Sequence, residues 1–117
     1  MPERPRFYLI TSTTNNVNYE TILDVGISTD ARGISYFTIA MDPDPNALYR
    51  ITIGSIMTVN ELELTAVWSL ELPHLTSGVY MGFRPGDRIV IQHRSPNATL
   101  IKTGVTLAFN EVVEYCV

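Results

Sequence analysis

The sequence predicts an all-β fold: an antiparallel β-sandwich, jelly-roll-like, with about eight to ten strands. Apolar and polar residues alternate with a period of two along much of the chain, which is the pattern of strands with one buried and one solvated face. Turn signals built from Gly, Pro, Asn and Asp recur roughly every ten residues, the spacing typical of sandwiches and barrels. No segment predicts a helix longer than one turn.

The clearest alternation runs from Glu61 to Leu72 and predicts one long strand. Its apolar residues share one face: Leu62, Leu64, Ala66, Trp68, Leu70 and Leu72. The other face is polar apart from Val67. A helix would scatter the leucines around its circumference. We therefore expect Trp68 to be buried in the core with Leu64 and Leu70.

The C-terminal segment alternates in the same way. Its apolar face consists of Val105, Leu107, Phe109, Val113 and Tyr115. Glu111 interrupts that face. We expect a bulge near residues 110–112 to restore the apolar phase after it.

The middle of the chain predicts Val79–Phe83 and Arg88–His93 as strands joined by a turn at Arg84–Asp87. Pro85-Gly86 supplies the fixed φ and the permissive φ that a type II turn requires. A second turn at Ser95-Pro96-Asn97 precedes a short strand at residues 99–102, which ends before Gly104.

The N-terminal half predicts further strands, separated by turns and by a proline-rigid connection at residues 42–46. The expected strands are Phe7–Thr11, Glu20–Ser28, Ile34–Met41, Leu48–Ile53 and Ile56–Val59. No repeat, low-complexity tract or linker divides the chain. Residues 1–117 are therefore expected to form a single β-sandwich domain, a size that supports one core.

The composition excludes several classes of function. The apolar fraction of 45% is ordinary, but only 17% of residues are charged and the net charge is −4. No basic run supplies the electrostatic face of a nucleic-acid binder, so we expect no nucleic acid partner. No apolar stretch is long enough for a transmembrane helix, and the first residues lack the apolar core of a signal peptide. We expect no membrane association.

No residues predict a metal or cofactor site. His74 lies beside a proline in an expected loop, and His93 ends a strand on the face of Ile89 and Ile91. A metal site needs several such ligands together. Asp42 and Asp44 could offer oxygens to Ca²⁺, but two carboxylates separated by prolines are more typical of a turn.

No residues predict catalysis either, and we expect the protein not to be an enzyme. Cys116 is the single cysteine and lies beside the last residue. Glu61, Glu63 and Glu71 are expected on the solvated face of one strand. Paired carboxylates can perform acid–base chemistry, but solvation of an exposed face explains these three.

Sugar binding would require exposed aromatic side chains. Trp68 is expected in the core, while Tyr8, Tyr49 and Tyr80 could reach the surface without forming a cluster in the sequence. The triplet Asn97-Ala98-Thr99 fits a glycosylation sequon, which we interpret as a turn that leads into a strand.

One segment resembles known families. Gly78–Gln92, which contains the Gly86-Asp87 turn, and the closing strand Val105–Phe109 resemble the last strands of tumour-necrosis-factor/C1q-type jelly rolls. They are also similar to the endings of phage and other viral fibre-head and capsid-decoration domains. The chain lacks the closing aromatic-Ser-Gly-Phe pattern of the C1q family. The resemblance covers about 40 residues, and it implies a jelly roll that assembles as a trimer.

Together these observations favour a non-enzymatic structural or assembly protein. We expect a virion component, such as a capsid-decoration or fibre or tail subunit, located in the virion. The expected partners are copies of the chain, with a trimer favoured, and a larger protein assembly. The alternative is a small carbohydrate- or ligand-binding β-sandwich module.

Overall fold

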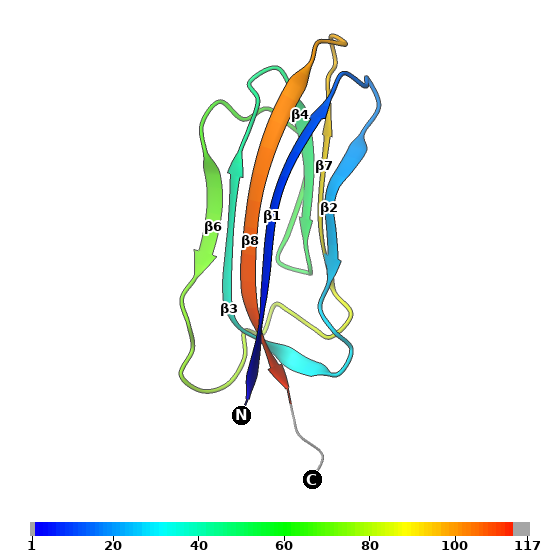
Figure 1. The fold of residues 1–117 in the computed structure, drawn as a ribbon. Coiled ribbons are helices and arrows are strands. Elements are labelled where there is room, and N and C mark those ends of the chain that lie inside the picture. The colour runs from blue at the N-terminus through cyan, green and yellow to red at the C-terminus, as the bar shows by residue number, and fades with distance from the viewer. Residues whose placement is uncertain (1, 114–117) are drawn as a thin grey trace.

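The computed structural model describes residues 2–113, and within that range the chain forms strands and no helix. The strands are β1 (Glu3–Thr14), β2 (Glu20–Gly26), β3 (Ala31–Asp42), β4 (Leu48–Ile53), β5 (Met57–Leu62), β6 (Trp68–Leu72), β7 (Arg88–Arg94) and β8 (Ile101–Val113). In the described range they make two four-stranded antiparallel sheets, ordered β1-β8-β3-β6 and β2-β7-β4-β5 (Figure 1). The predicted antiparallel β-sandwich is confirmed.

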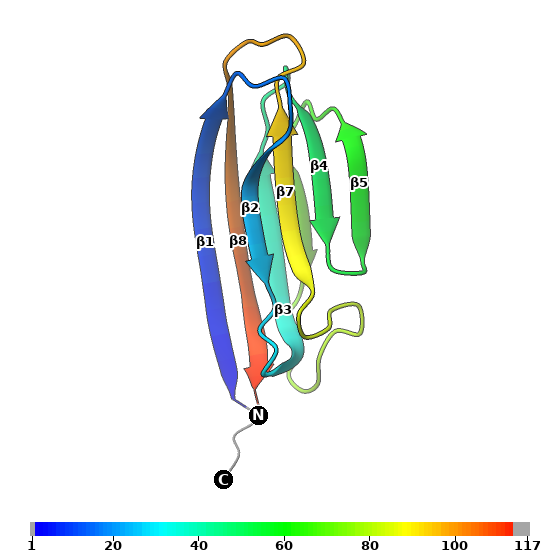
Figure 2. The same ribbon diagram turned by 90° about the vertical axis from the view of Figure 1, so that its right-hand side faces the viewer.

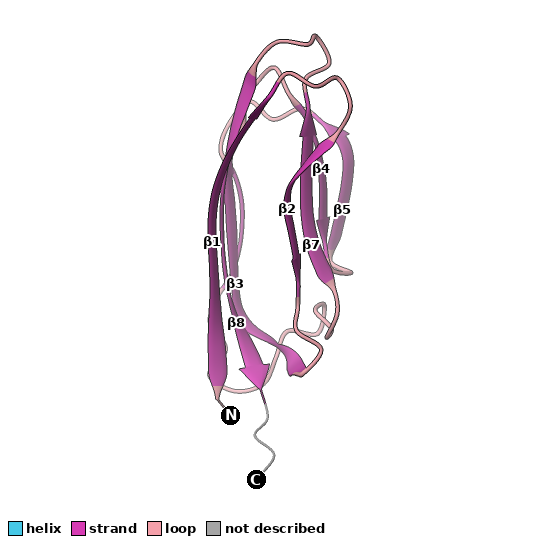
Figure 3. Ribbon diagram, turned by 45° about the vertical axis from the view of Figure 1, so that its right-hand side comes forward, coloured by secondary structure: helices cyan, strands magenta, loops and turns pink. Residues whose placement is uncertain are grey.

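The two sheets face each other and enclose the core between them (Figure 3). Phe37 and Phe109 project from one sheet and Tyr49 and Ile91 from the other, and all four are fully buried. Such interdigitation of two inner faces is the usual core of a sandwich. The strands run along the long axis of a molecule that measures 55 × 22 × 21 Å.

The first and last strands pair along their whole length. The register of β1 with β8 runs unbroken from Glu3 opposite Val112 to Thr14 opposite Ile101. β1 is an edge strand, and Figure 2 shows it at the margin of its sheet. The edge position also explains why Pro5 is tolerated within the strand.

The prediction of one strand from Glu61 to Leu72 is wrong. β5 ends at Leu62, and β6 begins at Trp68 in the other sheet, so the chain crosses between the sheets here. Glu61 has a φ of 59°, a left-handed conformation that ends regular strand geometry. Trp68 is half-buried rather than buried, because β6 is an edge strand.

The prediction of a strand at Val79–Phe83 is also wrong, because this segment is part of a loop. The loop contacts β3 at two separate points rather than through a ladder. Leu75 N donates to Ser35 O at 2.8 Å, and Tyr80 N donates to Ile34 O at 2.9 Å.

Two predicted strands prove too short. β1 extends well beyond residues 7–11 on both sides, and residue 101 begins a continuous β8 that includes Gly104. Register shifts lie in β3, between Ala31 and Gly33 and between Ile34 and Tyr36, rather than at residues 110–112 of β8. Tyr115 lies outside the described residues.

Other predictions hold. β4 has the predicted bounds, and β7 differs from its prediction by one residue at its end. At the predicted turn, Asp87 N donates to Arg84 O at 3.0 Å, and Gly86 has a φ of 85°. This positive φ is why the turn requires glycine.

Candidate functional site

The outer face of the β1-β8-β3-β6 sheet has almost no charge at its centre. Cross-strand rows place Phe7 beside Ala108 and Thr38, and Leu9 beside Thr106 and Ala40. We call this region the uncharged face. It consists of Pro5, Phe7, Leu9, Thr11, Thr38, Ala40, Ser69, Thr106 and Ala108. The charged side chains Glu3, Asp42, Glu71 and Lys102 lie at its margins.

Two large apolar side chains stand out on the uncharged face. Phe7 is 66% exposed and Leu9 is 71% exposed, and both come from the edge strand β1. Exposed apolar residues that are adjacent on one face are more informative than the same residues scattered singly. Contact of this face with another surface would therefore remove the apolar area of both side chains from water.

The outer face of the opposite sheet is charged and internally paired. Arg88 Nε lies 2.7 Å from Asp24 Oδ1, and Arg94 Nη2 lies 2.9 Å from Glu61 Oε2. The Arg50 guanidinium carbon lies 4.0 Å from the centroid of the Tyr19 ring. Ion pairs of this exposed kind keep a face solvated and contribute little to stability. Contact with a partner would therefore cost more desolvation free energy at the charged outer face than at the uncharged face.

A buried carboxylate holds the N-terminal strand in place. Glu111 is fully buried, on the core-facing side of β8 in phase with Phe109. Its Oε1 accepts hydrogen bonds from Arg4 Nε and Arg6 Nη1, both at 3.0 Å, and its Oε2 accepts one from Ser28 N at 2.6 Å. Burial would raise the pKa of Glu111, but these hydrogen bonds lower it overall. The carboxylate thus ties β1 and the β2–β3 loop to β8.

A buried polar chain crosses the core near the opposite end. His93 Nδ1 lies 3.0 Å from Thr103 Oγ1, which lies 2.7 Å from Tyr49 Oη, and Tyr49 Oη accepts a hydrogen bond from Asp44 N at 2.8 Å. His93 is on the face of Ile89 and Ile91, as predicted. Burial lowers the pKa of His93 and favours the neutral ring.

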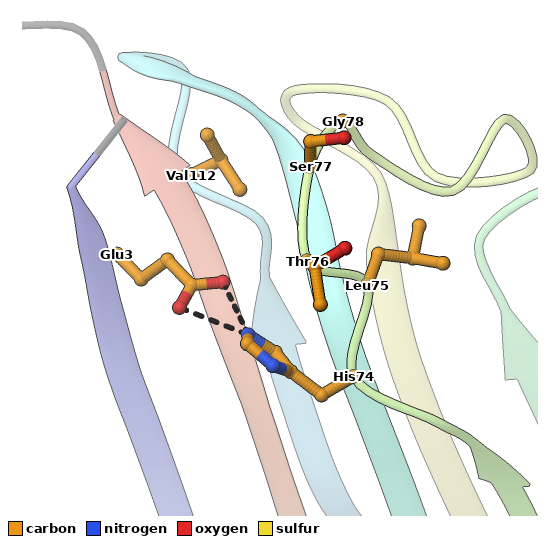
Figure 4. Close-up of a pocket in the computed structure, with 7 residues that line it drawn as sticks. All are labelled: Glu3, His74, Leu75, Thr76, Ser77, Gly78 and Val112. Atoms are coloured by element: carbon orange, nitrogen blue, oxygen red, sulfur yellow. Dashed lines mark hydrogen bonds and ion pairs between the residues drawn. The ribbon is translucent and has the colours of Figure 1, made fainter.

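His74 lies in the loop after β6 and lines a small pocket with Glu3 and Val112 (Figure 4). Its Nε2 lies 2.8 Å from Glu3 Oε1, and the Ser35 hydroxyl donates to the same carboxylate. Hydrogen bonds from Ser35 and from His74 lower the pKa of Glu3, and the bond from Ser35 has the larger effect. The pocket volume is about 180 Å³, which is small for a ligand site.

Asp42 is the last residue of β3, and Asp44, in the β3–β4 connection, has structural contacts. Asp44 Oδ1 accepts a hydrogen bond from Asn46 N at 2.9 Å, and Asp44 Oδ2 accepts one from Lys102 N at 3.1 Å. Such Asx contacts fix a turn. Among residues 2–113, no group of three or more His, Cys, Asp and Glu side chains is placed to hold a metal ion.

The three glutamates expected on one strand are separated. Glu61 lies near the end of β5 beside Arg94, Glu63 lies in the following loop, and Glu71 lies in β6 of the other sheet. The structure therefore does not bring them together as a carboxylate pair. Cys116 lies outside the described residues.

The candidate aromatic residues do not form a platform. Tyr49 is fully buried, and Tyr8, Tyr80 and Trp68 are half-buried against the core. The Tyr80 hydroxyl donates to Pro73 O. Asn97 lies in the turn before β8, where Ala98 N donates to Ser95 O at 3.1 Å, in agreement with the predicted turn.

Comparison of the chain with known protein families, with curated proteins and with solved structures finds no match. Over the part of the chain that the structure describes, no helix has the length and apolar character needed to cross a membrane. The surfaces and contacts of this molecule are therefore the basis on which its function is inferred.

Sequence reasoning missed both the uncharged face and the role of Glu111. The sequence does contain a signal for Glu111, because Glu111 falls on the same side of the alternating strand as Val105, Leu107 and Phe109. A charged residue on this core-facing side needs partners. Arg4 and Arg6 share one face of β1 and supply them. The signal for the face was the uncharged run from Phe7 to Thr14.

Proposed function

We propose that this protein is a non-enzymatic structural subunit, which associates with copies of itself and with a larger particle such as a virion. The observation that carries the proposal is the uncharged face, with Phe7 and Leu9 exposed at its edge. Removing apolar side chains from water on contact is favourable, and buried hydroxyl groups need only a hydrogen bond, whereas buried charges must be paired. The opposite, ion-paired face is suited to remain in water.

The strand order supports a jelly-roll interpretation of the sandwich. The chain changes sheet at every connection except the one between β4 and β5, and β1, β8, β3 and β6 lie opposite β2, β7, β4 and β5. Eight strands wound as two Greek keys produce this arrangement. Jelly rolls occur in viral capsid proteins, lectins and cupins alike, so the surface carries more weight than the fold.

A small ligand-binding module is the second candidate. The pocket beside Glu3 and His74 favours it, but its volume of about 180 Å³ is below the ~300 Å³ where small-molecule sites usually begin. Tyr49 and Trp68 pack in or against the core rather than forming a stacking surface for sugars. The assembly role is therefore the better supported of the two.

Light scattering on the purified chain, over a concentration series up to the high micromolar range, tests the self-association. We expect a mass that is a multiple of the 13.1 kDa chain; the family resemblance implies three copies. A glycan array probed with the same sample tests the alternative. A strictly monomeric protein that binds an array sugar contradicts the assembly role and favours the binding module.

A further inference from the structure

We infer that two copies of this chain pair through the free edge of β1, antiparallel over Phe7–Thr13, to form one continuous sheet. The inference rests on the proposed function and names the surface by which self-association occurs. The partner is a second copy because the edge of an antiparallel strand is complementary to the same edge rotated by a two-fold axis.

The backbone of β1 directs alternate residues outward. Val113 N donates to Pro2 O at 3.0 Å, and these two residues are opposite in the register that pairs Glu3 with Val112. In an antiparallel ladder every second residue directs both its N–H and its C=O to the same neighbour. The outward-directed residues are Pro5, Phe7, Leu9, Thr11 and Thr13. Pro5 has no N–H to offer, so the donors available for pairing begin at Phe7.

The other edge strands carry features that discourage pairing. β2 has a register shift between Thr21 and Leu23, and its exposed residues include Asp24. β5 has a register shift near Glu61, where φ is positive. β6 is only five residues long. Bulges, charges and short length are the usual protection of a sheet edge.

The segment Phe7–Thr14 carries none of these protections. It contains no charged residue and no proline, and its register with β8 is unbroken. The protected part of β1 is limited to its first residues, where Glu3, Arg4, Pro5 and Arg6 lie. A long, uncharged, regular edge is a template for another strand.

The side chains fit a pair centred on Ile10. In this register Phe7 of one copy lies opposite Thr13 of the other, Leu9 lies opposite Thr11, and Ile10 meets Ile10. Tyr8 and Ile10 face inward but are half-buried, so the pairing would also cover their exposed parts. The two uncharged faces would join into a surface twice as wide, available for docking to a particle.

The first experiment introduces like charges across the pair. The double variant L9K/T11K places ammonium groups opposite one another, and both side chains are exposed in the single chain. Like charges directly opposite in a sheet are destabilising. For the natural protein we expect light scattering to give a dimer, rather than the trimer that the family resemblance implies. For the variant we expect a dissociation constant raised by at least about tenfold. The matched control, T58K/N60K on the edge strand β5, should remain dimeric.

The second experiment restores the pairing. The variant L9E/T11E should also be monomeric alone, but an equimolar mixture with L9K/T11K should form heterodimers. In a Cys116→Ser background, Ile10→Cys should form an intermolecular disulfide under mild oxidation, because residues in a close antiparallel pair lie within disulfide distance. Thr58→Cys is the control that should not. Circular dichroism verifies that each variant is folded.

The outcomes separate this inference from the proposed function. Oligomers that persist in L9K/T11K, including a trimer, overturn pairing through β1 and leave the assembly role standing. A monomeric natural protein with no Ile10→Cys crosslink also overturns the pairing, and assembly would then depend on docking to a particle. If the charged variants fail to fold, the crosslink alone decides.

Discussion

At the scale of single residues, Glu111 shows how one buried charge can fix the position of a strand. Its carboxylate joins Arg4 and Arg6 of β1 to β8 and to the β2–β3 loop. The arginine side chains keep part of their surface in water, at 41% and 26% exposure, so the cluster is desolvated mainly on the carboxylate side. Removal of the carboxylate would therefore leave the arginines partly solvated, but the Ser28 N–H would lose the acceptor of its hydrogen bond.

Glu111→Gln is expected to lower the free energy of unfolding by about 3 kcal/mol, near the lower end for breaking a buried ion pair. Urea unfolding at neutral pH measures this change. The matched control is Glu63→Gln, because Glu63 is an exposed glutamate in the loop after β5. Equal stability of the two variants would contradict the role given to Glu111.

The acid dependence of stability gives a second measurement on the same residue. The folded-state pKa of Glu111 is lowered, so the unfolded state binds its proton first as pH falls. The contribution of Glu111 is fully present above the unfolded pKa of ~4.3, and it is lost as pH falls towards the lowered folded pKa. Urea unfolding across this acid range should show a shallower loss of stability in Glu111→Gln than in the natural protein.

His93 predicts a separate pH window. Burial lowers the folded-state pKa of His93. Below the unfolded-state pKa of ~6.5, the unfolded state therefore binds a proton while His93 in the folded state stays neutral. Stability should therefore fall as pH decreases from about 6.5 until the folded pKa is reached. Thermal unfolding between pH 7 and 5 should show this slope, and His93→Gln should remove it.

At the scale of elements, the turn before β7 and the first part of β8 show what a local sequence signal can predict. Pro85-Gly86 predicted the turn correctly, because a positive φ at glycine is a local requirement. Gly104 was placed after a short strand but lies inside β8, and its φ is not in the positive range. The two glycines should therefore respond differently to the same substitution.

Gly86→Val should destabilise the protein by about 1–2 kcal/mol, the cost of a left-handed conformation for a residue with a Cβ. Gly104→Val should be close to neutral, because an added Cβ would meet only Asp42 Cβ at 3.8 Å, and valine favours strands. Chemical unfolding of the two variants side by side measures the difference. A larger loss for Gly104→Val would contradict the backbone described here.

Trp68 shows why the alternation from Glu61 to Leu72 misled the prediction. A period of two reports a half-buried strand, but it does not report which sheet the strand joins or whether the chain leaves the strand midway. The alternation of apolar and polar residues continues through the crossing at residues 63–67, so the sequence pattern does not mark the point where the chain leaves one sheet for the other. The burial of Trp68 was overestimated because position at a sheet edge depends on strand order, which is set by contacts distant in sequence.

The consequence for Trp68 is measurable. Trp68→Ala should cost about 1–2 kcal/mol, less than the ~3–5 kcal/mol of a fully buried tryptophan. In the natural protein, the fluorescence maximum of Trp68 should lie between those of a buried and a fully exposed indole. Leu107→Ala, at a fully buried position of the central strand β8, is the comparison and should cost more.

At the scale of the whole molecule, the fold class could be predicted from the sequence, whereas the uncharged face, on which the proposed function depends, could not. Alternation and turn residues are local signals, so the sandwich followed from them. The uncharged face is assembled from β1, β8, β3 and β6, whose residues are far apart in the chain, and it appears only when their registers are known. The burial of Glu111 depends in the same way on arginines more than a hundred residues away.

The same long-range pairing should govern how the chain folds. β1 pairs with β8, so residue 3 must find residue 112 before the first sheet is complete. Closing so long a loop costs entropy before any contact is made, and proteins rich in distant pairings fold in milliseconds to seconds. Stopped-flow refolding from urea should therefore give a main phase in that range, and a microsecond main phase would contradict the topology. We expect β1 to pair late, because its ladder joins it to β8 across almost the whole chain. Glu111→Gln should therefore mainly accelerate unfolding rather than slow folding. The T58K/N60K control, which leaves the β1–β8 pairing untouched, should change neither rate appreciably.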